Sequence, residues 1–110
     1  MAVIAIDFDH TLVEGDKPID GAREAVNILR EAGHKVLIHS CNNIAWIKRV
    51  LENADIRYDG IYGETGLESK KPLADLYIDD RAIQFKGNWD VTLAEALDFV
   101  EARDNRKWDA

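Results

Sequence analysis

Hydrophobic and polar positions alternate along this chain in blocks typical of strands followed by helices. Residues 2–6 form an apolar, partly β-branched run that ends in Asp7, which predicts a buried strand. Further apolar runs predict strands at residues 35–39, at 76–78, more weakly at 60–62, and as a short edge strand at 89–91.

Two segments carry apolar residues at the spacing of an amphipathic helix, residues 22–32 and 44–54. Asp20 is expected to cap the first of these helices, and Asn42 or Asn43 the second. Each predicted helix therefore follows a predicted strand.

This alternation predicts an α/β fold with a three-layer, Rossmann-like parallel sheet flanked by helices. The spacing of Thr92 and Glu95 is that of a capping box and predicts a last helix that continues to about Val100. We expect one domain over residues 1–102 and a polar C-terminal tail over residues 103–110.

Two acidic residues, Asp7 and Asp9, come at the end of the first predicted strand. Side chains repeat with period two in a strand, so both carboxylates would leave the backbone on one side if strand geometry continued. Two carboxylates placed together repel each other, and a divalent cation bound through oxygen relieves that repulsion. The alternative interpretation is a strand that ends in a polar turn.

Polar residues also follow the other predicted strands, with Ser40 after the second and Asp79 and Asp80 after a later one. Ligands bind parallel sheets at the carboxyl ends of the strands, so these groups are expected to meet at one edge. Carboxylate ligands together with water suit Mg²⁺ better than zinc. Each acidic pair has the alternative of capping a turn.

A cation held by carboxylates favours a phosphate, because phosphate oxygens often complete the ligands of Mg²⁺. The hydroxyl of Ser40 and the backbone N–H groups from Cys41 onward, which open a helix, form a natural phosphate site. Lys70 or Lys71 would neutralise further charge, and together these groups suit phosphoryl transfer. Alternatively, Ser40 is an ordinary strand-end hydroxyl and the two lysines are a solvated surface pair.

Composition and net charge argue against some classes of function. The chain has 110 residues and a net charge of −7, which argues against a general nucleic-acid surface, although binding of a nucleic-acid end stays open. The single cysteine, Cys41, forms no internal disulfide and is expected to be a small buried residue. We expect no signal peptide, no membrane span and a cytoplasmic location. Two histidines, His10 and His39, are expected to be structural.

The order of these motifs resembles the haloacid dehalogenase superfamily. The resemblance implies a Rossmann-like sheet, dependence on Mg²⁺ and, usually, phosphohydrolase activity through an aspartyl-phosphate. It places the nucleophile at Asp7 and the general acid–base at Asp9, whose backbone carbonyl would also bind the metal. The remaining positions implied by the resemblance are Thr11 steadying the loop, Ser40 and Lys71 (or Lys70) binding phosphate, Asp80 binding the metal, and Asp79 binding it directly or lying just outside its ligands.

The chain departs from that family in three respects. His10 stands where the family commonly has glycine, and residues 64–74 barely accommodate a crossover helix. Neither residues 12–20 nor residues 52–68 are long enough for a cap domain, so we expect an open, capless site. Such a site suits a bulky phosphorylated substrate, or a lid from a partner subunit of a homo-oligomer.

Other interpretations compete with a phosphatase. A response-regulator receiver also combines acidic residues, a hydroxyl and a lysine, but its lysine comes last, whereas here Lys70 and Lys71 precede the second acidic pair. A non-catalytic protein that binds Mg²⁺ and phosphate, and a phosphotransferase with an acceptor other than water, both stay open.

Overall fold

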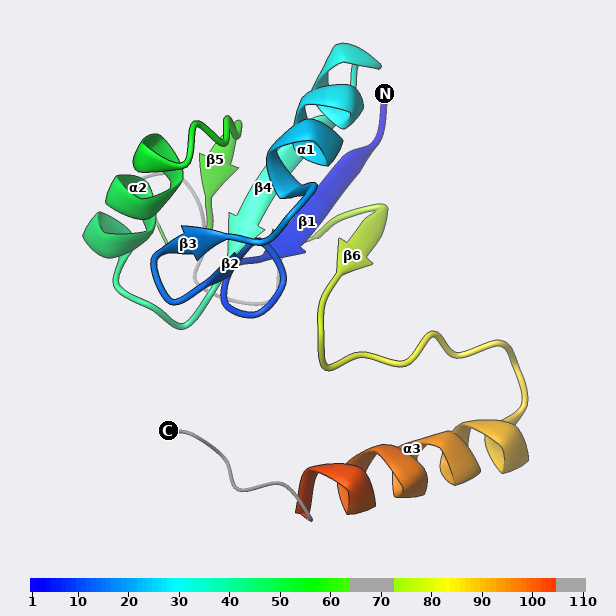
Figure 1. Cartoon of the computed structure of the whole chain (residues 1–110). Helices are drawn as coiled ribbons and strands as arrows, with labels where there is room; N and C mark the ends of the chain where they lie inside the picture. The colour runs from blue at the N-terminus through cyan, green and yellow to red at the C-terminus, as the bar shows by residue number, and fades with distance from the viewer. Residues whose placement is uncertain (64–72, 105–110) are drawn as a thin grey trace. The chain divides into compact units, whose positions relative to one another are not determined.

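The computed structural model describes residues 1–63 and 73–104, with side chains up to residue 102. The chain divides into two units, Met1–Asp80 and Arg81–Ala110. The first unit contains a mixed α/β arrangement with a parallel sheet (Figure 1). The predicted Rossmann-like α/β class is therefore confirmed.

Four strands form this sheet in the order β5-β4-β1-β6, and each neighbouring pair is parallel. The strands are β1 (Val3–Asp7), β4 (Lys35–His39), β5 (Gly60–Ile61) and β6 (Leu76–Ile78). The sequence predicted all four within one residue at either end. Because β1 lies between β4 and β6, the acidic end of β1 has a polar strand end on each side.

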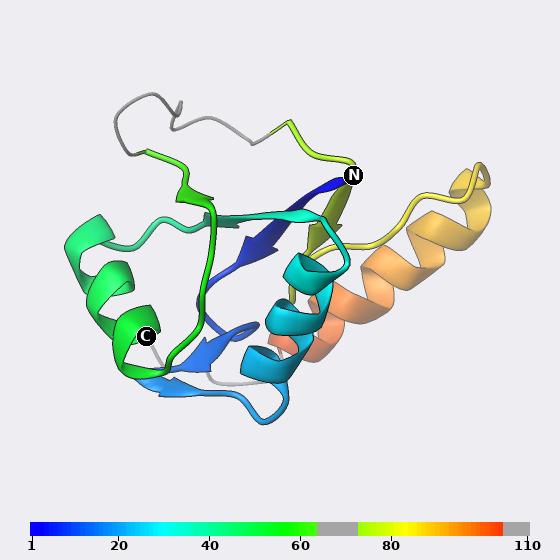
Figure 2. The same cartoon turned by 90° about the horizontal axis from the view of Figure 1, so that it is seen from above.

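Helices α1 (Ala22–Glu31) and α2 (Ile44–Asn53) pack on the same face of the sheet, as the view in Figure 2 shows. In-register neighbours on that face include Ile4 beside Val36 and Ile6 beside Ile38. They join side chains from both helices in one core, which comprises Ile4, Ile6, Phe8, Leu12, Val13, Val26, Val36, Ile38, Ile47, Val50, Leu51, Ile56 and Ile61. Asp7 and His39 alternate with these residues and so belong to the other face.

The caps of the two helices differ from the expected ones. The N-cap of α1 is Gly21 at φ 88° and makes no side-chain cap, so the prediction that Asp20 caps this helix is wrong. Glycine adopts this left-handed conformation without steric cost. At α2 the choice between the two asparagines is resolved, because Asn43 Oδ1 accepts a hydrogen bond from Trp46 N at 3.2 Å.

A short antiparallel hairpin, β2 (Val13–Glu14) with β3 (Lys17–Pro18), follows the first acidic pair. The apolar pattern predicted no strand here, because two-residue strands carry too little periodic signal. Leu12 and Val13 are buried, and Ile19 N donates to Leu12 O at 2.9 Å. The hairpin is thereby fixed next to the end of β1.

The second unit contains helix α3 (Trp89–Asp104). The edge strand predicted at residues 89–91 is wrong, because the helix already includes them. Asn88 Oδ1 accepts hydrogen bonds from Asp90 N at 2.9 Å and Val91 N at 3.3 Å, so Asn88 takes the capping role expected of Thr92. Among the described residues, no helix is both long and apolar enough to cross a membrane.

Candidate functional site

The carboxyl ends of three adjacent strands bring most of the predicted site together. Asp7 ends β1, Ser40 follows β4, and Asp79 and Asp80 follow β6. These residues lie up to 73 positions apart in sequence, and the strand order β4-β1-β6 makes them neighbours. The predicted convergence at one sheet edge is what the structure has.

The turn after β1 separates the two acidic residues. Phe8 is fully buried, and its carbonyl oxygen accepts hydrogen bonds from Leu12 N at 3.0 Å and Val13 N at 3.2 Å. His10 has φ 66°, a left-handed conformation in which a non-glycine residue is strained. Strand geometry therefore ends at Asp7 and does not extend to Asp9.

As a result the two carboxylates have different partners. Thr11 Oγ1 donates a 3.4 Å hydrogen bond to Asp7 Oδ2. Asp9 Oδ2 accepts hydrogen bonds from Ser40 Oγ at 3.5 Å and Asn42 Nδ2 at 3.3 Å. The turn thus directs Asp9 towards the loop after β4, while Asp7 stays in the sheet.

Asn42, which the sequence indicated only as a candidate cap of α2, also contacts the predicted site. Besides its contact with Asp9, its backbone N–H donates to Ser40 Oγ at 3.0 Å. The preceding residue, Cys41, is exposed, so the expectation of a buried cysteine is wrong. The only sequence signal for Asn42 is its place just before the cap of α2, and the predicted phosphate site at Ser40 and Cys41 stays a prediction.

Electrostatics single out Asp7. Burial, the charge of Asp79, and the hydrogen bond and charge of Asp80 together raise the pKa of Asp7 from 3.8 to about 6. Three carboxyl groups, those of Asp7, Asp79 and Asp80, therefore lie close together at the edge between β1 and β6, where ionisation of one disfavours ionisation of Asp7. An added cation would favour their ionised forms.

His39 is the second residue that the sequence missed. It pairs in register with Asp7. Ligand atoms of Asp7, His39 and Asp79 all lie within 4.8 Å of one another. Burial lowers the pKa of His39, and the charge of Asp79 opposes that shift. A half-buried imidazole among carboxylates is chemically unlike the structural histidine that was expected.

The proposed lysines cannot be placed in the same way. Lys70 and Lys71 lie outside the residues that the structure describes, as does the tail over residues 105–110. The lysine that would contact a phosphate stays a prediction.

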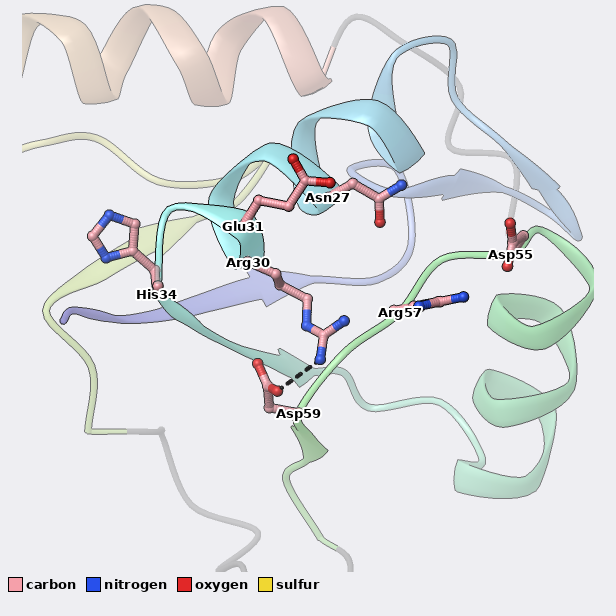
Figure 3. Close-up of a pocket in the computed structure, with 8 residues that line it drawn as sticks. Asn27, Arg30, Glu31, His34, Asp55, Arg57 and Asp59 are labelled. Carbon is pink, nitrogen blue, oxygen red and sulfur yellow. Dashed lines mark hydrogen bonds and ion pairs between the residues drawn. The ribbon is translucent and has the colours of Figure 1, made fainter.

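A polar groove of about 500 Å³ lies at the opposite, amino-terminal edge of the sheet (Figure 3). It contains an ion pair in which Arg30 donates to Asp59 at 3.1 Å, and Val36 N donates to the other Asp59 oxygen at 2.7 Å. Burial alone would raise the pKa of Asp59, but these donors outweigh it and hold that pKa below its usual range. We interpret this pair as a connection between α1 and the entry to β5.

Comparisons with known proteins agree with this geometry. The family model for haloacid dehalogenase-like hydrolases matches residues 4–87. The chain is also similar to a solved structure described as a conserved protein from Bacteroides thetaiotaomicron, with 24% identity and a TM-score of 0.60. That similarity covers 96% of this chain and 98% of the other, and it supports the fold alone. No curated protein matches the chain.

Proposed function

The chain belongs to the haloacid dehalogenase-like hydrolases, and from that premise we propose that it is a Mg²⁺-dependent phosphomonoesterase that forms an aspartyl-phosphate on Asp7. The observation that supports this most is the pKa of Asp7, which Asp79 and Asp80 help to raise to about 6. A carboxylate nucleophile has to be ionised to attack phosphorus, and a bound cation would lower the raised pKa of Asp7 and so favour its ionised form.

The residues present fit Mg²⁺. Carboxylate oxygens of Asp7, Asp80 and Asp79, with the backbone carbonyl of Asp9, would supply oxygen ligands, which Mg²⁺ prefers. When bound, the ion would neutralise charge on the phosphoryl group and keep Asp7 ionised.

In the first half-reaction a carboxylate oxygen of Asp7 attacks phosphorus, and the bond from phosphorus to the ester oxygen breaks. Asp9 gives its proton to that leaving oxygen, which departs as an alcohol. Thr11 holds Asp7 through its 3.4 Å hydrogen bond, and Asn42 and Ser40 hold Asp9. The two carboxylates thus have separate supports suited to separate roles.

In the second half-reaction Asp9, now ionised, takes a proton from water. The water oxygen attacks phosphorus, the bond to Asp7 breaks, and inorganic phosphate leaves. The backbone N–H groups that begin α2 would hold phosphoryl oxygens throughout, and the Ser40 hydroxyl would turn from Asp9 to donate to one of these oxygens when substrate binds. Lys71 or Lys70 would add positive charge. Both carboxylates return to their starting protonation.

The substrate is proposed to be bulky. Because neither loop is long enough for a cap, remote binding energy must come from the substrate's own surface or from a partner subunit. A panel of sugar phosphates, nucleotides, and 3′- and 5′-phosphorylated oligonucleotides tests this by phosphate release. Large substrates should be used more efficiently than a free sugar phosphate, and high efficiency of a monomer on a sugar phosphate would refute an open site.

The decisive experiment measures phosphate release in Mg²⁺, in EDTA, and after Mg²⁺ is restored in excess of EDTA. Activity should disappear in EDTA and return with Mg²⁺. Asp7→Asn should show neither turnover nor a covalent intermediate, whereas Asp20→Asn, an exposed change of the same charge, should be fully active. Full turnover without metal, or in Asp7→Asn, would refute the proposal.

A further inference from the structure

The row of side chains at the end of the sheet includes a histidine. The register pairs Asp7 with His39 on one side and Ile6 with Ile78 on the other, so Asp79 comes next to Asp7. In-register neighbours of a parallel sheet project to the same face. Across the sheet, the imidazole of His39 is therefore followed by the carboxylate of Asp7 and then by that of Asp79.

The imidazole in this row has an open nitrogen. His39 Nε2 is buried and has no hydrogen-bond partner among the described residues. A buried polar atom without a partner is costly, and a bound metal ion would offset that cost. Ligand atoms of His39, Asp7 and Asp79 lie within 4.8 Å of one another, close enough to share one ion.

We propose that His39 supplies a nitrogen ligand to transition-metal ions such as Co²⁺ at the cation site of Asp7 and Asp79, and that it thereby raises the affinity of this site for Co²⁺ relative to Mg²⁺. This inference rests on the proposed function, because it concerns the same cation site. Imidazole nitrogen suits first-row transition metals, whereas Mg²⁺ takes oxygen ligands.

The same residues also predict how removal of the His39 side chain would change the preference for Co²⁺ over Mg²⁺. Removing the imidazole leaves the carboxylates, so Mg²⁺ binding should change little. Co²⁺ loses its nitrogen ligand, and its affinity should fall by at least the roughly 10–100-fold seen when groups supporting a metal ligand are removed. The selectivity between the two ions, rather than either affinity alone, is therefore the diagnostic quantity.

The test is calorimetric titration of the metal-free full chain with MgCl₂ and with CoCl₂. Wild type should bind Co²⁺ at least about tenfold more tightly than Mg²⁺. His39→Ala should reduce this preference by roughly tenfold or more, and His39→Asn, which keeps a polar side chain, provides a second variant if alanine prevents folding. His34→Ala is the matched control, because His34 precedes the same strand at its other end, where Nδ1 accepts a hydrogen bond from Ala2 N.

Pulsed EPR of the Mn²⁺-loaded protein provides an independent measurement. Hyperfine coupling to an imidazole nitrogen should be present in wild type and His34→Ala, and absent in both His39 variants. Unchanged coupling, or an unchanged Co²⁺ preference in folded His39 variants, would overturn the inference. An equal loss of both ions would also overturn it, since it would indicate general damage to the site.

Asp7→Asn distinguishes this inference from the proposed function. If that variant loses both ions while the His39 variants bind like wild type, the metal site stands and only the role of His39 fails. If Asp7→Asn binds both ions like wild type, the metal site itself is refuted.

Discussion

Replacing the proposed nucleophile should stabilise the metal-free protein. In Asp7→Asn the amide cannot ionise, so the cost of burying a charge and the repulsion from Asp79 and Asp80 are both removed. The pKa of Asp7 rises from 3.8 to about 6 on folding, and a tenfold change in proton affinity corresponds to about 1.4 kcal/mol. The upper limit is therefore about 3 kcal/mol, which solvent screening of this half-buried group reduces to about 1–2 kcal/mol.

The sign depends on pH. A raised pKa means that the contribution of Asp7 to stability is fully present below about pH 4, where Asp7 is protonated in both states, and is lost as pH rises through about 6. The advantage of Asp7→Asn should therefore be absent near pH 4 and complete above about pH 7. One kcal/mol shifts the melting temperature of a small domain by about 4–8 °C, so the difference is measurable.

The assay is thermal unfolding followed by circular dichroism in EDTA, from pH 4 to pH 8. Asp20→Asn is the control, because Asp20 is exposed and does not cap α1. Adding MgCl₂ should stabilise wild type and leave Asp7→Asn unchanged. An Asp7→Asn protein that melts at or below the wild-type temperature at pH 8 in EDTA would refute the reasoning.

Three further predictions concern individual contacts. Asp9→Asn should lower kcat by about 10²–10⁴-fold and trap the phosphoryl group on Asp7 when the leaving group is good, as mass spectrometry of brief incubations would detect; label elsewhere would contradict the mechanism. Asp59→Asn should weaken the contacts with Arg30 and Val36 and lower the free energy of unfolding by about 1–3 kcal/mol at pH 7 with kcat unchanged. Because the pKa of Asp59 is lowered on folding, that difference should shrink as pH falls below about 4 in urea titrations, and a constant difference would argue against the ion pair. Asn43→Ala should cost about 0.5–2 kcal/mol through loss of the α2 cap, and unchanged stability in the same titrations would show that the cap contributes nothing.

The sequence predicted the main elements of the first unit because their signals are local. Apolar runs marked β1, β4 and β6, and helical spacing marked α1 and α2. Helix caps and short strands were harder to predict from the sequence, because a single side chain or a single turn determines each of them. Asn88 begins α3 earlier than Thr92 would have done, and that shift turned a predicted edge strand into the first turn of a helix.

The same distinction between local signals and tertiary contacts applies to the candidate site. Asp7, Asp9, Ser40, Asp79 and Asp80 were identified from the sequence, because each follows a strand and has a side chain suited to metal or phosphate chemistry. That much follows from residue type and position. Their roles in catalysis stay predictions.

Only the tertiary structure decided which of these groups meet. The strand order β4-β1-β6 and its register bring His39 and Asp79 to either side of Asp7, and the turn at Phe8 sends Asp9 to Asn42 instead. Hydrophobic periodicity fixes the face on which a residue lies, but it does not fix the neighbouring strand. That choice depends on how α1 and α2 pack over the shared core, and it is why a histidine that resembles an ordinary strand residue in sequence lies beside two carboxylates in the fold.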